Sequence, residues 1–290
     1  KNFKNYGYEH LGFEPSKNVS NYSRKINKVT VKNEFFTYKN SKKLKKFKKK
    51  TSLICAANVI SHIPNLKDLI KGLNVLLSKK GVFVFEEPYL GSMFNKVSYD
   101  QIYDAHIFIF SIHSVKNTFK NLGFELIDAI PQKTHGGSMR YIVSRYGERK
   151  VSKRLEQLIK KEKKMKLNNI SSCLKFKKKC FKSRNMFRKK IFEIKKAGKN
   201  IAGYAASAKS STVLNFCKID NRYVDFIADS TKEKIGKFTP GTHIPVVSIE
   251  YFKKNYPDYT ILCSWNHKNE IFIKEKEYKK KGGKWISHVK

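Results

Sequence analysis

The sequence of 290 residues predicts an α/β protein in which a mostly parallel sheet is followed by a second, smaller α/β unit. Three observations predict this class. Short apolar segments alternate with amphipathic segments over residues 8–145, the alternation resumes after Lys199, and residues 149–200 between them show no strand pattern. A chain of this length can bury two modest hydrophobic cores.

The first unit is expected to hold apolar strands joined by crossover helices. The expected strands are Glu9–Phe13, Val29–Val31, Ser52–Ala57, Gly81–Glu86, Phe124–Ile130 and Ser138–Ser144. A helix is predicted over Asn65–Leu77, after Pro64, and another over Ser114–Asn121, ended by Gly123. We expect the last two strands to form the hairpin that closes the sheet.

Residues 149–200 are rich in Lys and Arg and poor in acidic residues. Apolar residues nevertheless recur at helical spacing, at Leu155, Leu158, Ile159, Phe187, Ile191 and Ile194. The pattern predicts a pair of basic helices over residues 148–200, between domains at residues 1–147 and 201–290. A disordered linker is the alternative, and the persistent apolar spacing disfavours it.

The second unit has its own alternation of strands and turns. Its expected strands are Asn200–Tyr204, Tyr223–Ala228, Ile244–Val246 and Thr260–Cys263. A turn of small residues at 205–211 leads to a helix over Ser211–Cys217, and a Pro/Gly turn precedes the third strand. The sequence therefore predicts a small Rossmann-like domain.

Composition and charge bear on two classes of protein, those that bind nucleic acids and those that span membranes. The net charge of +39 permits nucleic-acid binding, but the excess is mostly Lys spread over the chain, without the Arg forks or motifs of specific readers. A solvated Lys-rich surface is therefore favoured. No apolar segment is long enough to span a membrane.

Cysteine usage bears on the compartment and on metals. The five cysteines are widely spaced and form no CxxC pair, so neither a disulfide framework nor a zinc site is expected. A reducing cytoplasm is the natural compartment for such a chain.

Glu14 ends the first expected strand. An acid at the end of an early parallel strand commonly binds the ribose hydroxyls of a nucleoside cofactor. The alternative is an acid that stabilises the N-terminus of the next helix. A glycine-rich loop is expected upstream of such an acid, and Lys1–Tyr6 is too short to hold the loop and its strand. We therefore expect the chain to lack its first strand and this loop.

Ala57, Asn58 and His62 follow the apolar strand at 52–57, at an edge of the sheet where α/β proteins bind ligands. A helical turn would align Asn58 with His62, which are four residues apart. The alternative for His62 is a capping or core histidine.

Tyr103 and His106 lie three residues apart, before an apolar and aromatic segment. Histidine is the side chain best suited to proton transfer near neutral pH. From the residues alone, a satisfied histidine beside an aromatic core is the favoured alternative.

Further candidate site residues lie in or beside turns. His135, followed by two glycines and with Arg140 behind it, fits a crevice wall or equally a tight hairpin. Lys209 lies in the turn at 205–211, whose backbone N–H groups fit a phosphate, although the turn lacks Walker spacing and fits a purely structural role as well. Asp229 and His243 are candidates for the far wall of the site, whereas Trp265 and His267 are expected to be packing residues.

The ordered set of these motifs resembles the nucleotide-sugar C-methyltransferases, typified by deoxysugar C-3 methyltransferases. The segments that carry the resemblance are LGFEPS (11–16), AANVISHIPN (56–65), FEEPYL (85–90), DQIYDAHIFIFS (100–111), THGGSMR (134–140), GYAASAKSS (203–211), PGTHIP (240–245) and SWN (264–266). Together they cover essentially the whole chain, and the set is specific although no single motif is.

The resemblance implies a class I methyltransferase-like Rossmann sheet followed by a smaller Rossmann-like domain, with the family's N-terminal zinc domain absent. It implies an S-adenosylmethionine-dependent C-methyltransferase acting on a nucleotide-linked 4-keto-deoxysugar, expected to be a dTDP-sugar. Glu14 and Ala57 would bind the cofactor, and His106 would be the general base beside Tyr103. The substrate-binding residues would be Asn58, His62, His135 and Lys209.

One position departs from the family pattern, which has Glu immediately before the histidine where this chain has Ala105. A carboxylate there would orient or charge the imidazole. Nearby Asp104 is a candidate substitute, although neighbouring side chains on a strand or helix point in different directions. A nucleotide-sugar-binding remnant is therefore the alternative to an active enzyme, and a basic nucleic-acid-binding protein is a more distant one.

Overall fold

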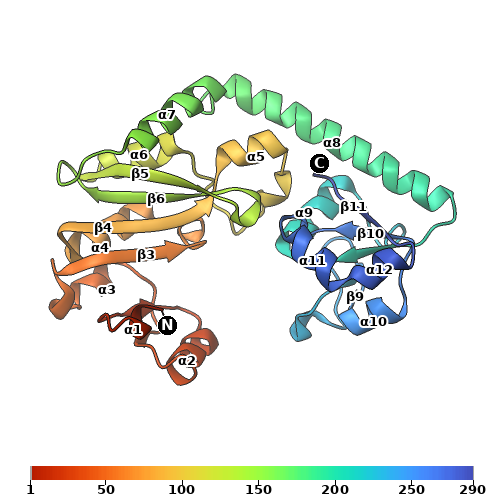
Figure 1. The fold of residues 1–290 in the computed structure, drawn as a ribbon, viewed down its shortest axis with the longest axis horizontal. Helices are drawn as coiled ribbons and strands as arrows, with labels where there is room; N and C mark the ends of the chain where they lie inside the picture. The colour runs from red at the N-terminus through yellow and green to blue at the C-terminus, as the bar shows by residue number, and fades with distance from the viewer. Residues whose placement is uncertain (1, 290) are drawn as a thin grey trace. The chain divides into compact units, whose positions relative to one another are not determined.

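The computed structural model describes residues 2–289 and shows an α/β fold with three sheets among them (Figure 1). Two compact units divide the chain. The first unit holds the residues up to Phe85 together with 114–129 and 141–156, and the second unit holds 86–113, 130–140 and the residues from Gln157 onward. The chain therefore passes between the units several times.

The larger sheet of the first unit has four strands. They are β3 (Thr51–Ala57), β4 (Leu77–Pro88), β5 (Phe124–Gln132) and β6 (Ser138–Arg145), in the order β3-β4-β6-β5. These four strands confirm the predicted segments, although β4 starts four residues earlier than expected. Its buried residues alternate only from Gly81 onward, and the exposed pair Lys79 and Lys80 disguised the start of the strand as a loop.

Helices pack beside this sheet. Helix α4 (Leu66–Leu76) begins where the side chain of Asn65 accepts a hydrogen bond from the N–H of Asp68, and α6 spans Ile112–Lys120. Aromatic side chains fill the core, where Phe85 stacks on Tyr141 with ring centroids 4.9 Å apart and both side chains are fully buried. Both predicted helices are thus confirmed.

A second sheet of the first unit has only two parallel strands, β1 (Gly12–Phe13) and β2 (Val31–Lys32). The predicted strands at 9–13 and 29–31 were wrong in their extent. Only Gly12 and Phe13 pair with Val31 and Lys32, and the N–H of Val29 bonds the carbonyl of Ser23 at 3.3 Å instead of a neighbouring strand. The helices here are short: α1 (Asn2–Asn5), α2 (Lys17–Lys25), α3 (Tyr38–Lys42), η1 (Lys45–Phe47) and η2 (Ile60–His62).

The basic segment forms two helices, α7 (Lys153–Met165) and α8 (Ile170–Lys196). The side chain of Asn169 caps α8 by accepting from the N–H of Ser171. The buried face of α8 carries Phe176, Cys180, Phe187, Ile191 and Ile194, which join the core of the second unit. The segment is therefore not a disordered linker, whereas the expected domain bounds stay a prediction.

The sheet of the second unit is parallel throughout. Its strands are β7 (Ile201–Tyr204), β8 (Phe226–Ala228), β9 (Val246–Val247), β10 (Tyr259–Leu262) and β11 (Lys284–Ile286), in the order β11-β10-β7-β8-β9. Apolar clusters cover both of its faces, as expected of a parallel sheet. The sequence did not predict β11, because only three residues of strand follow a Lys- and Gly-rich segment.

The remaining elements of the second unit are short except for one helix. Helix α9 (Ala208–Cys217) starts three residues before the prediction, because Ser207 and Ser210 form a capping box. The others are α5 (Leu90–Lys96), η3 (Tyr99–Gln101), η4 (Thr134–Gly136), η5 (Lys232–Lys234), α10 (Ile249–Lys254), η6 (Trp265–His267), α11 (Lys268–Lys274) and α12 (Lys276–Lys280).

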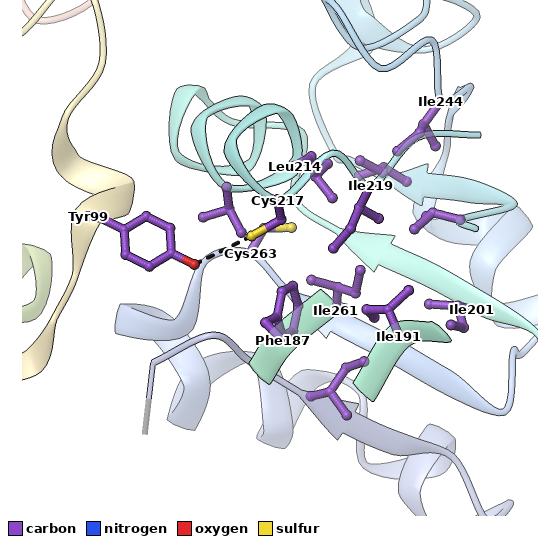
Figure 2. Close-up of a cluster of buried hydrophobic side chains, with 14 of the residues drawn as sticks. Tyr99, Phe187, Ile191, Ile201, Leu214, Cys217, Ile219, Ile244, Ile261 and Cys263 are labelled. Atoms are coloured by element: carbon purple, nitrogen blue, oxygen red, sulfur yellow. Dashed lines mark hydrogen bonds between the residues drawn. The ribbon is translucent and has the colours of Figure 1, made fainter. Parts of the chain in front are cut away.

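Figure 2 shows one of these clusters, in which the hydroxyl of Tyr99 points at the sulfur of Cys217, 3.5 Å away. Tyr99 belongs to η3, so this contact attaches η3 to α9. Burial raises the pKa of Cys217 to about 11, which leaves it a neutral thiol. Across residues 2–289, no helix combines the length and apolarity needed to cross a membrane.

Candidate functional site

The imidazole of His106 is held in one tautomer by its own loop. Its Nδ1 lies 2.9 Å from the carbonyl oxygen of Gln101, and its Nε2 lies 2.7 Å from the hydroxyl of Tyr103. A carbonyl oxygen only accepts hydrogen bonds, so Nδ1 carries a proton, and in the neutral imidazole Nε2 therefore accepts from the Tyr103 hydroxyl. The nitrogen with the lone pair is therefore Nε2.

Tyr103 and His106 also stack, with ring centroids 4.0 Å apart and an interplanar angle of 30°. A backbone hydrogen bond from the N–H of His106 to the carbonyl of Tyr103 closes the turn that makes this possible. Burial, followed by the charges of Glu87 and Asp100, raises the pKa of Tyr103. The phenol therefore stays protonated at neutral pH and remains a hydrogen-bond donor.

The departure at Ala105 has a local compensation. In His–carboxylate pairs the carboxylate accepts from one ring nitrogen and fixes the other as a base. Here the Gln101 carbonyl performs that orienting task, and the side chain of Ala105 is exposed. A carbonyl carries no full negative charge, so it orients the imidazole with less stabilisation of an imidazolium.

The loop is anchored by a buried acid that sequence analysis missed. Asp100 is fully buried, with one carboxylate oxygen 3.2 Å from Nε2 of His288 and the other accepting from the indole N–H of Trp265 at 2.9 Å. Burial raises the pKa of Asp100, but the bonds from His288 and Trp265 outweigh it and leave the pKa below its ordinary value. Trp265 thus packs as expected and also fixes η3.

The structure brings His135 and Lys209 into one electrostatic environment. Burial and then the charges of Lys209 and His267 lower the pKa of His135, and burial lowers the pKa of Lys209 against the effect of Asp100. His135 adopts a left-handed conformation with φ of 49°. The following Gly136 is required, because a Cβ there would lie 2.1 Å from the Trp265 ring.

Arg140 is engaged with Glu86 within the second unit. Its Nε and Nη2 donate to one carboxylate oxygen at 3.1 and 2.8 Å, while the Thr134 hydroxyl donates to the other at 2.7 Å. This pairing fixes the end of β4 against the turn that carries His135. Arg140 therefore supports the turn, which fits its expected place behind His135.

Glu14 is half-buried at the carboxyl end of β1, as the sequence suggested. One carboxylate oxygen accepts from the N–H of Ser16 at 2.8 Å, just before α2 begins. The side chain of Asn33 donates to the carbonyls of Glu14 and Pro15, at 2.9 and 2.8 Å, and so ties the ends of β1 and β2 together. The bond from the Ser16 N–H fits the expected role at a helix start, and the ribose-binding role stays a prediction.

The expected helical turn from Asn58 to His62 is wrong. Asn58 takes φ of 54° and Val59 takes φ of −128°, so the short η2 helix begins only at Ile60. Asn is one of the few residues that tolerates the left-handed region, which lets the chain turn sharply after β3. Ala57, Asn58 and His62 are all exposed at this end of the strand.

A second acid of the first unit was missed. Glu34 lies two residues after β2, and its Oε2 is buried without a hydrogen-bond partner among residues 2–289. Because β1 and β2 are parallel neighbours, Glu14 and Glu34 follow strand ends on the same edge. A buried acceptor left in this way fits the hydroxyl or amino donors of a nucleoside. Its signal in the sequence is weak: an acid just before the aromatic pair Phe35 and Phe36.

The predicted site residues thus divide between the units. Glu14, Ala57, Asn58 and His62 belong to the first unit, whereas Tyr103, His106, His135 and Lys209 belong to the second.

Asp229 ends β8 beside a pocket of about 220 Å³ lined by residues that include Tyr204, Ala205 and Ser230. Its carboxylate accepts from the N–H groups of Ala206 and Thr231, at 2.7 and 2.8 Å. The side chain is nearly buried, at 7% exposure. Asp229 therefore ties the turn after β7 to the end of β8, and its place in the wall of a sugar site stays a prediction.

Comparison with known proteins covers nearly the whole chain. Residues 1–129 match the family described as a methyltransferase domain, and residues 133–289 match the C-methyltransferase C-terminal domain. A curated relative, the C-methyltransferase NovU of Streptomyces niveus, is 26% identical over 285 residues, which cover 98% of this chain and 68% of the relative.

Two solved structures are more distant. A protein of Pyrococcus horikoshii is 15% identical over 49% of this chain and 74% of its own, with a TM-score of 0.37. A SAM-dependent methyltransferase of Archaeoglobus fulgidus is 19% identical over 45% of this chain and 56% of its own, with a TM-score of 0.35.

Proposed function

We propose, given that this chain belongs to the C-methyltransferase family and is an S-adenosylmethionine-dependent methyltransferase, that it methylates a carbon of a nucleotide-linked 4-keto-deoxysugar. The carbon is the one beside the keto group, whose C–H bond that group acidifies. The nucleotide is expected to be dTDP. The observation that carries the proposal is the fixed tautomer of His106, with its basic nitrogen facing Tyr103.

His106 Nε2 would take the proton from the acidified carbon. The C–H bond breaks, a bond from Nε2 to the proton forms, and the electron pair passes into the keto group as an enolate. The cofactor supplies an electrophilic methyl group on a sulfonium. The enolate carbon would form its new C–C bond to that methyl group, and the electron pair of the S–C bond would stay on the sulfur. Holding the carbon in line with the methyl group supplies much of the rate.

The hydroxyl of Tyr103 is a hydrogen-bond donor next to the Nε2 of His106. In this structure its hydroxyl donates to His106 Nε2. When a keto-sugar binds, the hydroxyl would turn to the developing enolate oxygen and leave the Nε2 lone pair to take the proton. The raised pKa of the phenol keeps this donor protonated, and a hydroxyl aimed at developing negative charge stabilises it.

The residues of the first unit fit the nucleoside part of the cofactor. Glu14 stands at the end of β1 with one oxygen bonded to the Ser16 N–H, and Glu34 keeps a buried, unsatisfied oxygen at the end of β2. We assign the cofactor to Glu14 and Ala57, with Glu34 as an added acceptor. Asn58 and His62, exposed after β3, are assigned to the sugar, and His135 and Lys209 to the remainder of the substrate.

The free cysteines fit a reducing compartment. Cys55 and Cys173 are exposed thiols, and Cys180, Cys217 and Cys263 are buried ones. We propose a cytoplasmic location on this ground.

Hydrogen exchange at the reacting carbon tests the base without requiring methyl transfer. The chain would be incubated with dTDP-4-keto-6-deoxyglucose in heavy water, and proton NMR would follow the loss of the signal beside the keto group. We expect His106→Ala to slow enzyme-dependent exchange by about 100-fold or more. Asp104→Asn, an exposed change two residues away, is the matched control and should exchange as the parent does.

The test also separates the alternatives. Exchange that survives in His106→Ala would overturn the assignment of the base. A parent chain that binds the dTDP-sugar and exchanges nothing would instead establish the nucleotide-sugar-binding remnant, which the absence of a carboxylate at Ala105 favours.

A further inference from the structure

A buried pair of an acid and a histidine joins two segments of the second unit that are far apart in the sequence. Nε2 of His288, two residues after β11, lies 3.2 Å from one carboxylate oxygen of Asp100 in η3, and the side chains are 1% and 0% exposed. The other oxygen of Asp100 accepts from the indole of Trp265 at 2.9 Å. The pKa of Asp100 lies below its ordinary value, so Asp100 is a carboxylate at neutral pH and His288 donates to it from Nε2.

The ring of His288 is itself packed in place. Its centroid lies 4.9 Å from that of Tyr99 and 6.2 Å from that of Phe187. The backbone carbonyl of His288 accepts from the hydroxyl of Ser183 at 3.2 Å. Tyr99 precedes Asp100 in η3, whereas Phe187 and Ser183 belong to α8. His288 is therefore in contact both with the helix and with the segment that carries Asp100.

Asp100 is one peptide unit away from the atom that orients the imidazole of His106. The next residue, Gln101, is the one whose carbonyl oxygen accepts from Nδ1 of His106 at 2.9 Å. Removing one partner of a buried pair leaves an uncompensated charge, which is strongly unfavourable. We expect Asp100 to relieve such a charge by turning towards water, and this would displace the neighbouring Gln101 carbonyl.

We propose that His288 is a positioning residue for His106. Through Asp100, it holds the Gln101 carbonyl at the place where this acceptor keeps the proton on Nδ1 and the lone pair on Nε2. The inference rests on the proposed function for what the base then does, whereas the positioning itself is measurable without turnover. It assigns the segment after β11 a part in the reaction, although His288 acts only through Asp100 and Gln101.

The tautomer of His106 is the readout that tests this positioning. In a chain labelled with ¹⁵N-histidine, NMR distinguishes a protonated ring nitrogen from one that carries a lone pair, and the His106→Ala variant identifies the signals of His106. At about pH 8 an ordinary imidazole is neutral, and we expect the parent chain to show the proton on Nδ1.

Two substitutions separate the hydrogen bond of His288 from its packing. His288→Phe keeps a ring against Tyr99 and Phe187 but has no donor for Asp100. We expect it to mix the two tautomers of His106 and to slow hydrogen exchange at the reacting carbon by about tenfold or more. His288→Gln loses the ring and keeps an N–H donor, so it should retain the Nδ1–H tautomer and exchange at close to the parent rate.

Tyr278→Phe is the matched control, since it removes a buried hydroxyl that donates to the Lys284 carbonyl at 3.2 Å, in the apolar cluster on the other face of the sheet. It should lower the urea midpoint and leave the tautomer of His106 unchanged. Asp100→Asn repeats the test should His288→Phe not fold, because an amide presents an acceptor oxygen to only one of the two donors.

The parent tautomer in His288→Phe, or a mixture in His288→Gln alone, overturns the inference, because packing and not the donor would then decide. A change in Tyr278→Phe as large as that in His288→Phe would overturn it as well. Tautomers that follow the donor at position 288, in a chain that exchanges no hydrogen, would keep the positioning role and remove the proposed base.

Discussion

Glu14 and Asp229 are two acids that follow the ends of short parallel strands, one in each unit. Each accepts a hydrogen bond of 2.8 Å from the N–H two residues further along the chain. They differ in burial and in the number of hydrogen bonds that they accept. Asp229 is nearly buried and also accepts from Ala206 and Lys234, whereas Glu14 is half-buried and makes its bond at the start of α2.

The difference teaches that the position of an acid at a strand end does not by itself define a ribose-binding residue. A carboxylate whose lone pairs are taken up by backbone N–H groups is part of the turn, since a ligand could bind it only by breaking those bonds. Asp229 is such a residue, and Glu14 retains acceptor capacity. We therefore assign a stabilising role to Asp229 and propose cofactor binding for Glu14.

The largest effect is expected for Asp229→Ala. The change removes two part-buried hydrogen bonds, from the N–H groups of Ala206 and Thr231 to a carboxylate. Because hydrogen bonds to charged groups are each worth roughly 1.5–3 kcal/mol, we expect the unfolding free energy to fall by about 3 kcal/mol. Urea denaturation followed by circular dichroism measures this loss. Cofactor-product affinity, measured with S-adenosylhomocysteine under native conditions, should not change. Equal unfolding midpoints for parent and variant would contradict the structural role.

Glu14→Ala should give the reverse pattern. We expect the affinity for S-adenosylhomocysteine to fall about tenfold, which corresponds to 1.4 kcal/mol, because the carboxylate that would bind the ribose hydroxyls is gone. The unfolding free energy should fall by less than about 1 kcal/mol, as expected for one partly exposed hydrogen bond. Calorimetric titration measures the affinity, and urea denaturation measures the unfolding free energy. A variant that is as destabilised as Asp229→Ala and binds normally would break the comparison.

The pH dependence of stability should show a smaller difference. Burial raises the pKa of Asp229, but hydrogen bonds from Thr231 and Ala206 and the charge of Lys234 bring it below its ordinary value of 3.8. A lowered folded pKa means that the unfolded chain takes up the proton first. The contribution is therefore complete above the unfolded pKa and is lost as pH falls through the folded one.

Acidification from about pH 5 downward should thus reduce the stability gap between the parent and Asp229→Asn. Urea midpoints at several pH values provide the measurement, with Glu14→Gln as the companion variant. A gap that stays constant into the acid range would show that Asp229 gains nothing from ionisation in the fold.

The sequence predicted the strongly apolar elements well and the short ones poorly. Strands β3, β5 and β6 stand out because their apolar segments are long, whereas β1 and β2 have two residues each and β11 has three. Their register depends on neighbours that a local pattern does not contain. Asn58 shows the same limit of a local pattern. Its left-handed φ prevents the helical turn that was expected from Asn58 to His62.

The candidate residues were identifiable from motifs, but their surroundings were not. The Gln101 carbonyl that fixes His106 belongs to the backbone and leaves no residue-type signal. The partners of Asp100 lie 165 and 188 positions away in the sequence.

The most direct measurement is methyl transfer itself. The chain would be incubated with S-adenosylmethionine carrying a ¹³C methyl group and with dTDP-4-keto-6-deoxyglucose, and the products examined by NMR. Our account predicts that the label appears on the carbon beside the keto group, and that His106→Ala abolishes this transfer while Asp104→Asn does not. Label that remains on the cofactor, in a chain that binds both S-adenosylhomocysteine and the dTDP-sugar, would contradict the claim that this chain is a working C-methyltransferase.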